Sequence, residues 1–322
     1  MMDLYIVHPM HNLKFVETLM IRPNMNFAMV ACGLFILISG ATISINKRNE
    51  GIIEFYKKRL LRVLIPFYIA YIIYFIIKVF TNHTIFIFGG VPKWRFIFTI
   101  FGMDEYLSAN GIRTFSLGVG EWFLGCIILC YLVYPLLYKV HKKNRIVTFI
   151  LITIYYVLIN LNYDKFNFKI VSYMNFLCQI YNFYLGIAIA DTGMLKKIKK
   201  WSLAVTIPII LFFYFCSVNI PMPDNFKTTI VIVSLLITFY QFEDLLSNSV
   251  ILKKVIMIFN EISLEIFLVH HFIIYQVDYM LGYRRLSGVE TLAVIIGNFI
   301  LTILLSIIVK KISSIILVKI RR

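Results

Sequence analysis

Two neighbouring histidines, His270 and His271, occur near the end of a long apolar segment. An ionisable side chain at membrane depth is costly and is therefore a candidate functional group. An imidazole with a pKa near 6.5 can accept a proton from a hydroxyl near neutral pH. At helical spacing Ser263 and His270 share one face. Glu261 and Glu265 fall on the opposite face, and His271 points between the two. The spacing favours His270 and Ser263 as a pair that lines one cavity; the alternative is a histidine hydrogen-bonded inside a helix bundle.

Glu121 begins another apolar segment, after two glycines and directly before Trp122. A carboxylate beside an indole can hold a sugar, with the sugar ring stacked on the indole and a hydroxyl bonded to the carboxylate. The same pair is typical of an anchor at the membrane surface, where tryptophan is enriched. Both interpretations stay open from the sequence.

His8 and His11 have the spacing His-x-x-His. Two such side chains on a helix could contact one metal ion, but Pro9 lies between them and no third ligand is near. We therefore predict no metal site here, and favour a single histidine that acts as general base on a hydroxyl. The remaining histidines, His83 and His141, fall in connections between apolar segments and are expected to be solvated.

A basic stretch, residues 47–62, follows the first apolar segment. Arg59 and Arg62 are three residues apart and share a helical face. Guanidinium groups match phosphate oxygens, so this pair could hold the phosphates of a nucleotide or coenzyme. The alternative is ordinary retention of basic residues on the cytoplasmic side. The sequence has no Walker-type loop and no GxGxxG, which disfavours an ATP-driven pump.

The composition indicates which elements must position these residues. Of the 322 residues, 60% are hydrophobic and 15% charged, and the mean hydropathy is +0.84. Soluble domains are about 45–50% apolar and about 25% charged, so we expect an integral membrane protein. The net charge of +16 would fit a nucleic-acid partner, but basic residues in short loops set orientation instead, and we expect no nucleic acid. The five cysteines lie in apolar runs without CxxC pairs, so neither disulfides nor a zinc site is expected.

A membrane-spanning helix needs about 20 mostly apolar residues. The pattern predicts an all-α, polytopic bundle of about nine spans, forming one transmembrane domain over residues 25–322. The nine segments are 25–46, 61–80, 119–138, 146–161, 171–190, 201–219, 227–242, 255–276 and 289–309.

The distribution of basic residues predicts the orientation. One set of alternate connections, together with the C-terminal tail, holds 21 of the 32 lysines and arginines. The side richer in these residues is the cytoplasm. We therefore expect a multi-pass protein of the plasma membrane with a cytoplasmic C-terminus. Nine spans then place residues 1–24 outside, as an extracytoplasmic segment.

Four motifs occur in order along the chain: LFILISG (34–40), FYKKRLLRVLIP (55–66), EWFLGCIILCYLVYP (121–135) and SLEIFLVH (263–270). They resemble the signature of the bacterial acyltransferase 3 family, which shows FF-x-x-SG, FxxxRxxRxxP, WFL…Y…P and S-x-x-x-Y-L-x-H segments. The resemblance covers nearly the whole chain. Members are multispanning O-acyltransferases of surface polysaccharides.

The beginning of the chain departs from the family pattern. The family starts with a helix that carries a basic residue about ten positions before a histidine at its outer end. Residues 5–8, Tyr-Ile-Val-His, resemble the end of that helix, and the basic residue would precede Met1. Ten helices are expected for the family, so the expectation is that most of the first helix is missing and that 1–24 is its remnant.

The resemblance implies transfer of an acyl group, most often acetyl, from acetyl-CoA or another acyl-CoA to a hydroxyl of a capsular or other surface polysaccharide or its lipid-linked repeat unit. No metal is implied, and the partners are the bilayer and the acceptor. His8 is implied as the general base, and Arg59 and Arg62 as the acyl-CoA-binding residues. The acceptor cavity is expected to include Ser39, Glu121, Trp122, Ser263 and His270.

Two other classes stay open. A polysaccharide exporter or proton-coupled transporter could use the same histidines and carboxylates as a proton relay, although no internal repeat of the kind such folds show is visible. An inactive truncated copy, or a non-catalytic subunit of a polysaccharide synthase, is the second alternative.

Overall fold

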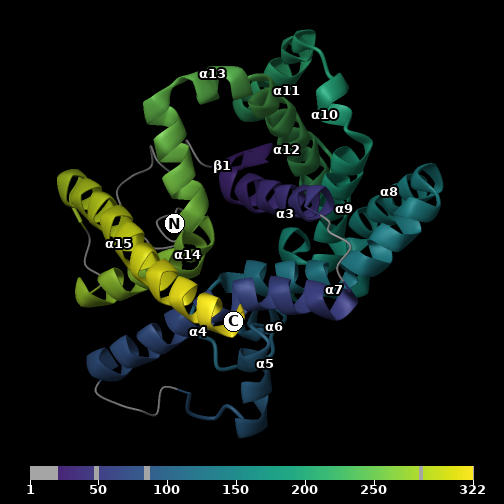
Figure 1. Ribbon diagram of the computed structural model, residues 1–322. Coiled ribbons are helices and arrows are strands. Elements are labelled where there is room, and N and C mark those ends of the chain that lie inside the picture. Colours follow the sequence, from purple (N-terminus) through teal and green to yellow (C-terminus); the bar gives the residue numbers. More distant parts are fainter. Residues whose placement is uncertain (1–20, 47–50, 83–87, 283–285, 322) are drawn as a thin grey trace. The chain divides into compact units, whose positions relative to one another are not determined.

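The computed structural model describes residues 21–46, 51–82, 88–282 and 286–321, and it is helical almost throughout (Figure 1). The larger helices are α3 (Phe27–Ile45), α4 (Ile52–Asn82), α7 (Glu121–Lys143), α8 (Arg145–Leu161), α9 (Phe176–Thr192), α11 (Leu203–Phe215), α12 (Asp224–Gln241), α14 (Val250–Met280) and α15 (Gly288–Arg321). The smaller elements are β1 (Ile21–Arg22), β2 (Met25–Asn26), η1 (Lys93–Arg95), α5 (Phe96–Ile100), α6 (Asp104–Ala109), η2 (Tyr163–Phe166), η3 (Ser172–Met174), α10 (Met194–Lys197), η4 (Lys200–Ser202) and α13 (Glu243–Asn248).

Asparagine side chains begin several of the helices. Asn26 accepts hydrogen bonds from the N–H groups of residues 28 and 29 at the start of α3. Asn144 accepts one from residue 147 in α8, and Asn175 one from residue 177 in α9. Each asparagine satisfies N–H groups that the first helical turn leaves unpaired. At the other end of α9, Gly193 adopts a φ of 60°, the left-handed conformation in which helices commonly stop.

A helix lies at each of the nine predicted apolar segments, which confirms the all-α class. By length and composition, four helices in the described residues are long and apolar enough to cross a membrane: Phe27–Ile45, Ile52–Thr81, Glu121–Lys143 and Gly288–Ile320. The helices Arg145–Leu161 and Lys200–Phe215 are apolar but shorter. The number of about nine spans is therefore not confirmed.

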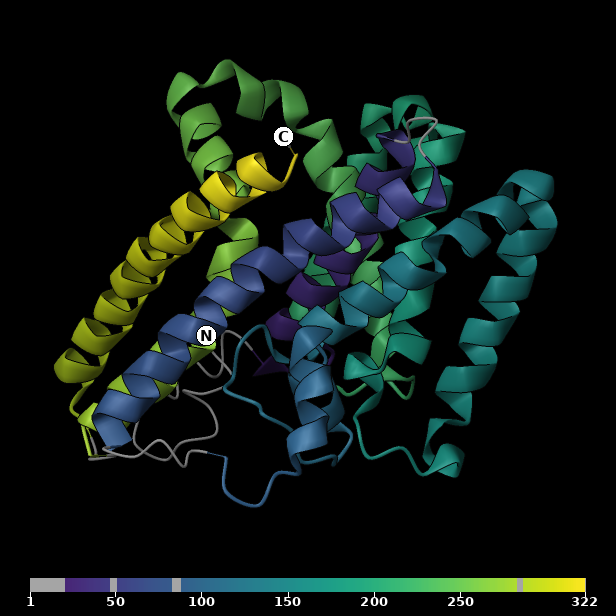
Figure 2. The same ribbon diagram turned by 60° about the horizontal axis from the view of Figure 1, so that its bottom comes forward.

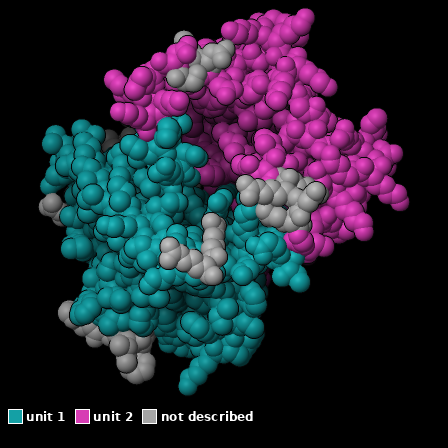
Figure 3. Space-filling model, viewed as in Figure 1, with its two compact units in different colours: residues 1–17, 53–128, 255–322 teal, residues 18–52, 129–254 magenta. Residues whose placement is uncertain are grey.

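The chain forms two compact units. Unit 1 contains residues 1–17, 53–128 and 255–322, and unit 2 contains residues 18–52 and 129–254. Figure 3 colours unit 1 teal and unit 2 magenta.

In unit 2, α3 packs closely against α9 because glycines leave room for backbone contact. A Cβ added at Gly40 of α3 would overlap the carbonyl oxygen of Phe183, and one added at Gly186 of α9 would overlap that of Leu37. Small residues of this kind let apolar helices approach where lipid supplies no hydrophobic driving force. Gly40 is the glycine of the Ser-Gly motif, so this motif has a direct packing role.

A buried polar network joins α8, α9 and α12 in unit 2. The Tyr156 hydroxyl donates to the carbonyl of Asn225 over 2.8 Å and lies 2.8 Å from the Thr229 hydroxyl. Thr229 donates to the Asn182 side chain over 2.9 Å, and Asn225 to that of Asn160 over 2.6 Å. Hydrogen bonds between helices hold polar side chains inside an apolar bundle at low cost.

In unit 1, α14 lies against α4 on one side and α15 on another (Figure 2). The rings of Tyr74 in α4 and Phe272 in α14 stack with centroids 3.6 Å apart. Val294 and Ile295 of α15 pack against the fully buried Ile274 of α14. The connection between α4 and α7 folds into η1, α5 and α6 and provides the support for the N-terminus of α7.

Candidate functional site

Glu121 begins α7 with an unusual backbone. Its φ is 42°, and it follows Gly118 at 80° and Gly120 at 74°. A positive φ is readily adopted by glycine but is strained for glutamate, and such strain is characteristic of functional positions. The two glycines allow the chain to turn sharply into α7, and the turn determines where the Glu121 carboxylate lies.

The Glu121 carboxylate pairs with His271 of α14. Oε1 of Glu121 lies 2.6 Å from Nδ1 of His271, and the His271 side chain is buried. An ion pair between a carboxylate and an imidazole orients the ring, as in sites that use histidine for proton transfer. The pair joins residues 150 positions apart in sequence, because two helices of unit 1 meet here.

Gly120 allows the turn before α7 to approach α14. A Cβ at this position would lie 2.8 Å from Cδ2 of Leu268, one helical turn before His271. Leu268 is itself fully buried, and its carbonyl accepts a hydrogen bond from the Tyr74 hydroxyl over 3.3 Å. The α4 helix therefore supports the part of α14 that carries the histidine.

Glu105 of α6 holds the turn from its other side. Its Oε1 accepts hydrogen bonds from the Ser116 hydroxyl over 2.6 Å and from the Gly118 N–H over 2.5 Å. Burial raises the pKa of the Glu105 carboxyl, while these two hydrogen bonds act in the opposite direction. Charge-assisted bonds to a carboxylate are among the stronger ones in proteins, so Glu105 fixes the segment from which Glu121 extends.

His270 lies beside this pair but has different partners. Its Nδ1 lies 3.1 Å from the Ile266 carbonyl and 2.8 Å from the Phe267 carbonyl, both on its own helix. Its ring is 4.3 Å from that of His271. Ser263 donates to the Asn260 carbonyl on the same helix. The structure therefore places His271 against the carboxylate, while the role of His270 and Ser263 in lining a cavity stays a prediction.

Other predicted site residues are distributed over both units. Trp122 is buried and its ring meets that of Phe123 edge to face. Arg59 and Arg62 lie near the beginning of α4 in unit 1, Arg59 half-buried and Arg62 exposed. Ser39 belongs to unit 2, where its hydroxyl is 2.9 Å from that of Tyr131. His8 lies outside the described residues.

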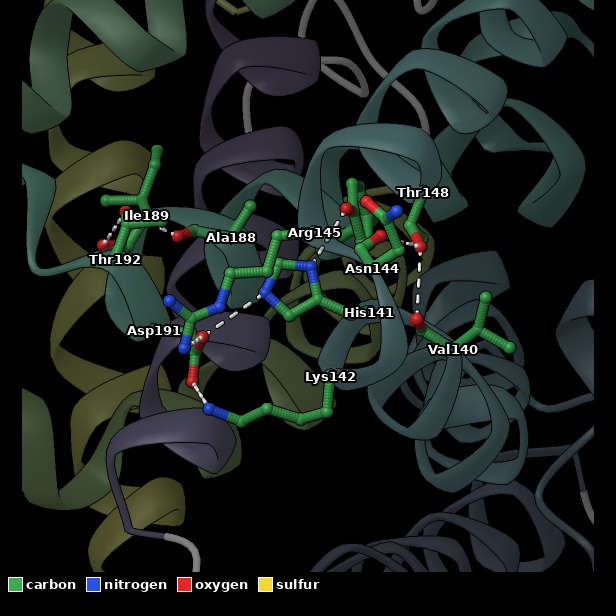
Figure 4. Close-up of polar contacts among 11 residues, drawn as sticks. Val140, His141, Lys142, Asn144, Arg145, Thr148, Ala188, Ile189, Asp191 and Thr192 are labelled. Carbon is green, nitrogen blue, oxygen red and sulfur yellow. Dashed lines mark hydrogen bonds and ion pairs between the residues drawn. The ribbon is translucent and has the colours of Figure 1, made fainter.

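A second charged cluster lies in unit 2 around Asp191 of α9 (Figure 4). Its carboxylate pairs with Lys142 and with Arg145, the latter over 2.7 Å. His141 is 3.4 Å away through Nε2, and its Nδ1 is 3.0 Å from the Tyr184 hydroxyl. The prediction that His141 is solvated was wrong: only 1% of the residue is exposed, because α9 covers it.

Sequence reasoning missed His271, Glu105 and His141 as partners in these clusters. The local signal for Glu105 was weak, since a glutamate in a connection is ordinarily solvated. The signal for His271 was its position between the two faces of α14. In the described part of the chain, no three His, Cys, Asp or Glu side chains are grouped so that they could hold a metal ion.

The chain was compared with known proteins. A family model described as an acyltransferase domain matches residues 1–311. The chain belongs to this family, the acyltransferase 3 family, which confirms the resemblance inferred from the four motifs. No curated protein and no solved structure gave a significant match.

Family membership and the apolar helices together indicate a membrane acyltransferase. The pair of the half-buried Glu121 carboxylate and the buried His271 imidazole lies in unit 1, at the start of the motif that begins with Glu121 and next to the motif that ends with His270. Two of the family motifs therefore meet at one place in the fold.

Proposed function

We propose that the protein is a membrane O-acyltransferase that moves an acyl group, most often acetyl, from acyl-CoA to a hydroxyl of a capsular or other cell-surface polysaccharide. The observation that carries the proposal is the pair formed by Glu121 and His271, because it brings the first residue of one family motif against a buried histidine that directly follows another. A sugar hydroxyl is a poor nucleophile at neutral pH, so such a transfer benefits from positioned proton-accepting groups.

In the proposed reaction the hydroxyl oxygen forms a bond to the acyl carbon, and the carbon–sulfur bond of the thioester breaks. A base takes the hydroxyl proton and a proton is returned to the leaving sulfur, so the products are the ester and free coenzyme A. His8 is the proposed base, as the family resemblance implies. His271, oriented by Glu121, is proposed to contact the acceptor hydroxyl together with Trp122, Ser263 and His270, which all belong to unit 1.

Transfer of radiolabelled acetyl to polysaccharide in membranes tests the proposal. His8→Ala is expected to lower the rate by about 100- to 10,000-fold, the range for loss of a general base. His11→Ala should have much less effect, because a proline between the two histidines, Pro9, disfavours one continuous helix through both. His271→Ala should also reduce transfer, with expression and membrane insertion unchanged in all three.

Each contrary outcome is informative. Full activity of both His8→Ala and His271→Ala would contradict general-base catalysis by these histidines. Activity lost in His11→Ala but kept in His8→Ala would move the base by one turn. A wild-type chain that transfers no acyl group from acetyl-CoA or longer acyl-CoA would contradict the enzyme assignment for this chain.

The proposed orientation has a cytoplasmic C-terminus and an extracytoplasmic connection between α4 and α7, in the plasma membrane. Ser108 in this connection and Asn144 between α7 and α8 are both exposed and suit cysteine labelling. In intact cells an impermeant thiol reagent should label Ser108→Cys and leave Asn144→Cys unlabelled. The reverse pattern would overturn the orientation.

A further inference from the structure

Helix α15 has one polar face that is buried along its length. Thr291, Asn298, Thr302, Ser306 and Ser313 are each at most 1% exposed. With Lys310 they fall within an arc of about 120° on the helix. Thr291 and Ser313 are 22 positions apart, which corresponds to about 33 Å of helix, comparable to the thickness of the hydrocarbon core.

The opposite face of α15 is apolar and exposed. It carries the large side chains Ile296, Ile300, Leu304, Ile307 and Ile308, which are 45–53% exposed. In a membrane this face contacts lipid, and the polar face is turned toward the protein.

Helix α14 provides the partner for the polar face. Glu265 is 1% exposed and its Oε1 lies 3.4 Å from Nζ of Lys310 on α15. Further along, Ile274 of α14 contacts residues 294 and 295 of α15, so the two helices run antiparallel. Figures 1 and 2 both show α15 beside α14.

Some polar groups at this interface lack hydrogen-bond partners among the described residues. They include Oε2 of Glu265 and the hydroxyl of Thr302. Small polar residues can hold helices together in a dry interface, but a carboxylate with one oxygen unpaired is costly there. Water bound between the helices would satisfy both groups.

We propose that α14 and α15 line a water-accessible path within unit 1, through which water reaches the Glu265 carboxylate. The path opens at Lys310, whose side chain is 43% exposed, and extends past Ser306 to Thr302. This inference concerns the two helices alone and does not depend on acyl transfer.

Carbodiimide labelling of the wild-type chain in native membranes tests access from water to Glu265. A water-soluble carbodiimide activates carboxyl groups that it can reach, and glycinamide then forms an amide that mass spectrometry locates. Glu265 should be labelled, with Glu290 at the start of α15 as the control carboxyl in the same helix pair. Labelling of Glu290 without Glu265 would overturn the proposal.

Cysteine accessibility tests the path with matched controls. In a chain whose five native cysteines are replaced, Thr302→Cys and Ser306→Cys should react with a charged thiosulfonate reagent. Leu304→Cys and Ile308→Cys lie at the same depth on the lipid-facing side. The thiolate is the reactive form of a cysteine, and contact with lipid or a dry interior raises the thiol pKa. Each unit of that rise lowers the thiolate fraction about tenfold. We therefore expect the two polar-face cysteines to react at least roughly ten times faster than the two lipid-facing ones.

Equal, slow rates at all four positions would show a dry interface and would overturn the path. Fast labelling of the two polar-face cysteines without carbodiimide labelling of Glu265 would show that the path does not reach Glu265 and would overturn that part of the proposal. The unfolding midpoint of each variant, measured in detergent, must match that of the cysteine-free parent. If Thr302→Cys fails to fold, Ser313→Cys at the open end of the path replaces it.

Discussion

The backbone N–H of Gly118 donates a hydrogen bond to Oε1 of Glu105 over 2.5 Å. This contact fixes the segment that leads, three residues later, to Glu121 at a φ of 42° and so to the pair with His271. A carboxylate in a short connecting helix therefore controls the position of a second carboxylate that faces a histidine of α14.

Replacing Glu105 tests this control. Glu105→Ala removes two hydrogen bonds to a charged group, each worth about 1.5–3 kcal/mol, and should lower the thermal unfolding midpoint and the rate of acyl transfer. Glu105→Gln keeps an acceptor oxygen and should retain part of both. Glu54→Ala, an exposed glutamate of α4, is the control and should be neutral. Equal unfolding midpoints and equal transfer rates for Glu105→Ala and Glu54→Ala would show that Glu105 does not position the segment before Glu121.

Gly186 should tolerate no side chain. Gly186→Ala places a Cβ against the Leu37 carbonyl and must separate α3 from α9, which should lower the free energy of unfolding by about 1–3 kcal/mol or more. Gly297→Ala in α15 is the matched control, since an added Cβ there meets no atom within 4 Å. Unfolding midpoints in detergent compare the two. A similar midpoint for both variants would contradict the close helix contact.

Asp104 should make the stability depend on pH. Burial raises the pKa of its carboxyl from 3.8 to about 6, so between these values the folded chain retains a proton that the unfolded chain has lost. This group's contribution to stability therefore falls as pH rises through that window. Asp104→Asn removes this pH dependence. The thermal unfolding midpoint of the variant minus that of the wild type should therefore increase from about pH 4 to about pH 7.5.

The control for Asp104 is Asp164→Asn, since Asp164 is an exposed carboxyl in the connection after α8. Its midpoint relative to wild type should be the same at both pH values. If the difference in midpoint between Asp104→Asn and wild type is also the same at both pH values, the Asp104 carboxyl has the same pKa in the folded and unfolded chains.

Arg59 is proposed to bind a phosphate of the coenzyme. Arg59→Lys keeps the charge but loses the forked contact, so acyl-CoA affinity should fall by roughly one to two decades, corresponding to about 1.5–3 kcal/mol. Arg62→Lys should behave similarly. Binding of acyl-CoA to purified protein gives the affinity directly. Unchanged affinity in both folded variants would leave the arginines as determinants of orientation.

Several features of the protein could be predicted from the sequence because they depend on neighbouring residues. Apolar runs gave the all-α class and a helix at each of nine places. Four motifs in the same order as in the family were sufficient to identify the family. The predicted number of about nine spans is not confirmed, since four of the described helices have the length and composition needed to cross a membrane.

The tertiary structure decided which ionisable side chains meet. Helical spacing grouped His270 with Ser263 but could not show which residue of α14 meets Glu121; the approach of Gly120 to Leu268 brings Glu121 to His271. Likewise α9 covers His141, which the sequence placed in a solvated connection. The physical reason is that periodicity defines the faces of one helix, whereas the partner of each face depends on contacts between helices distant in the chain, and these are set by packing at positions such as Gly40, Gly120 and Gly186.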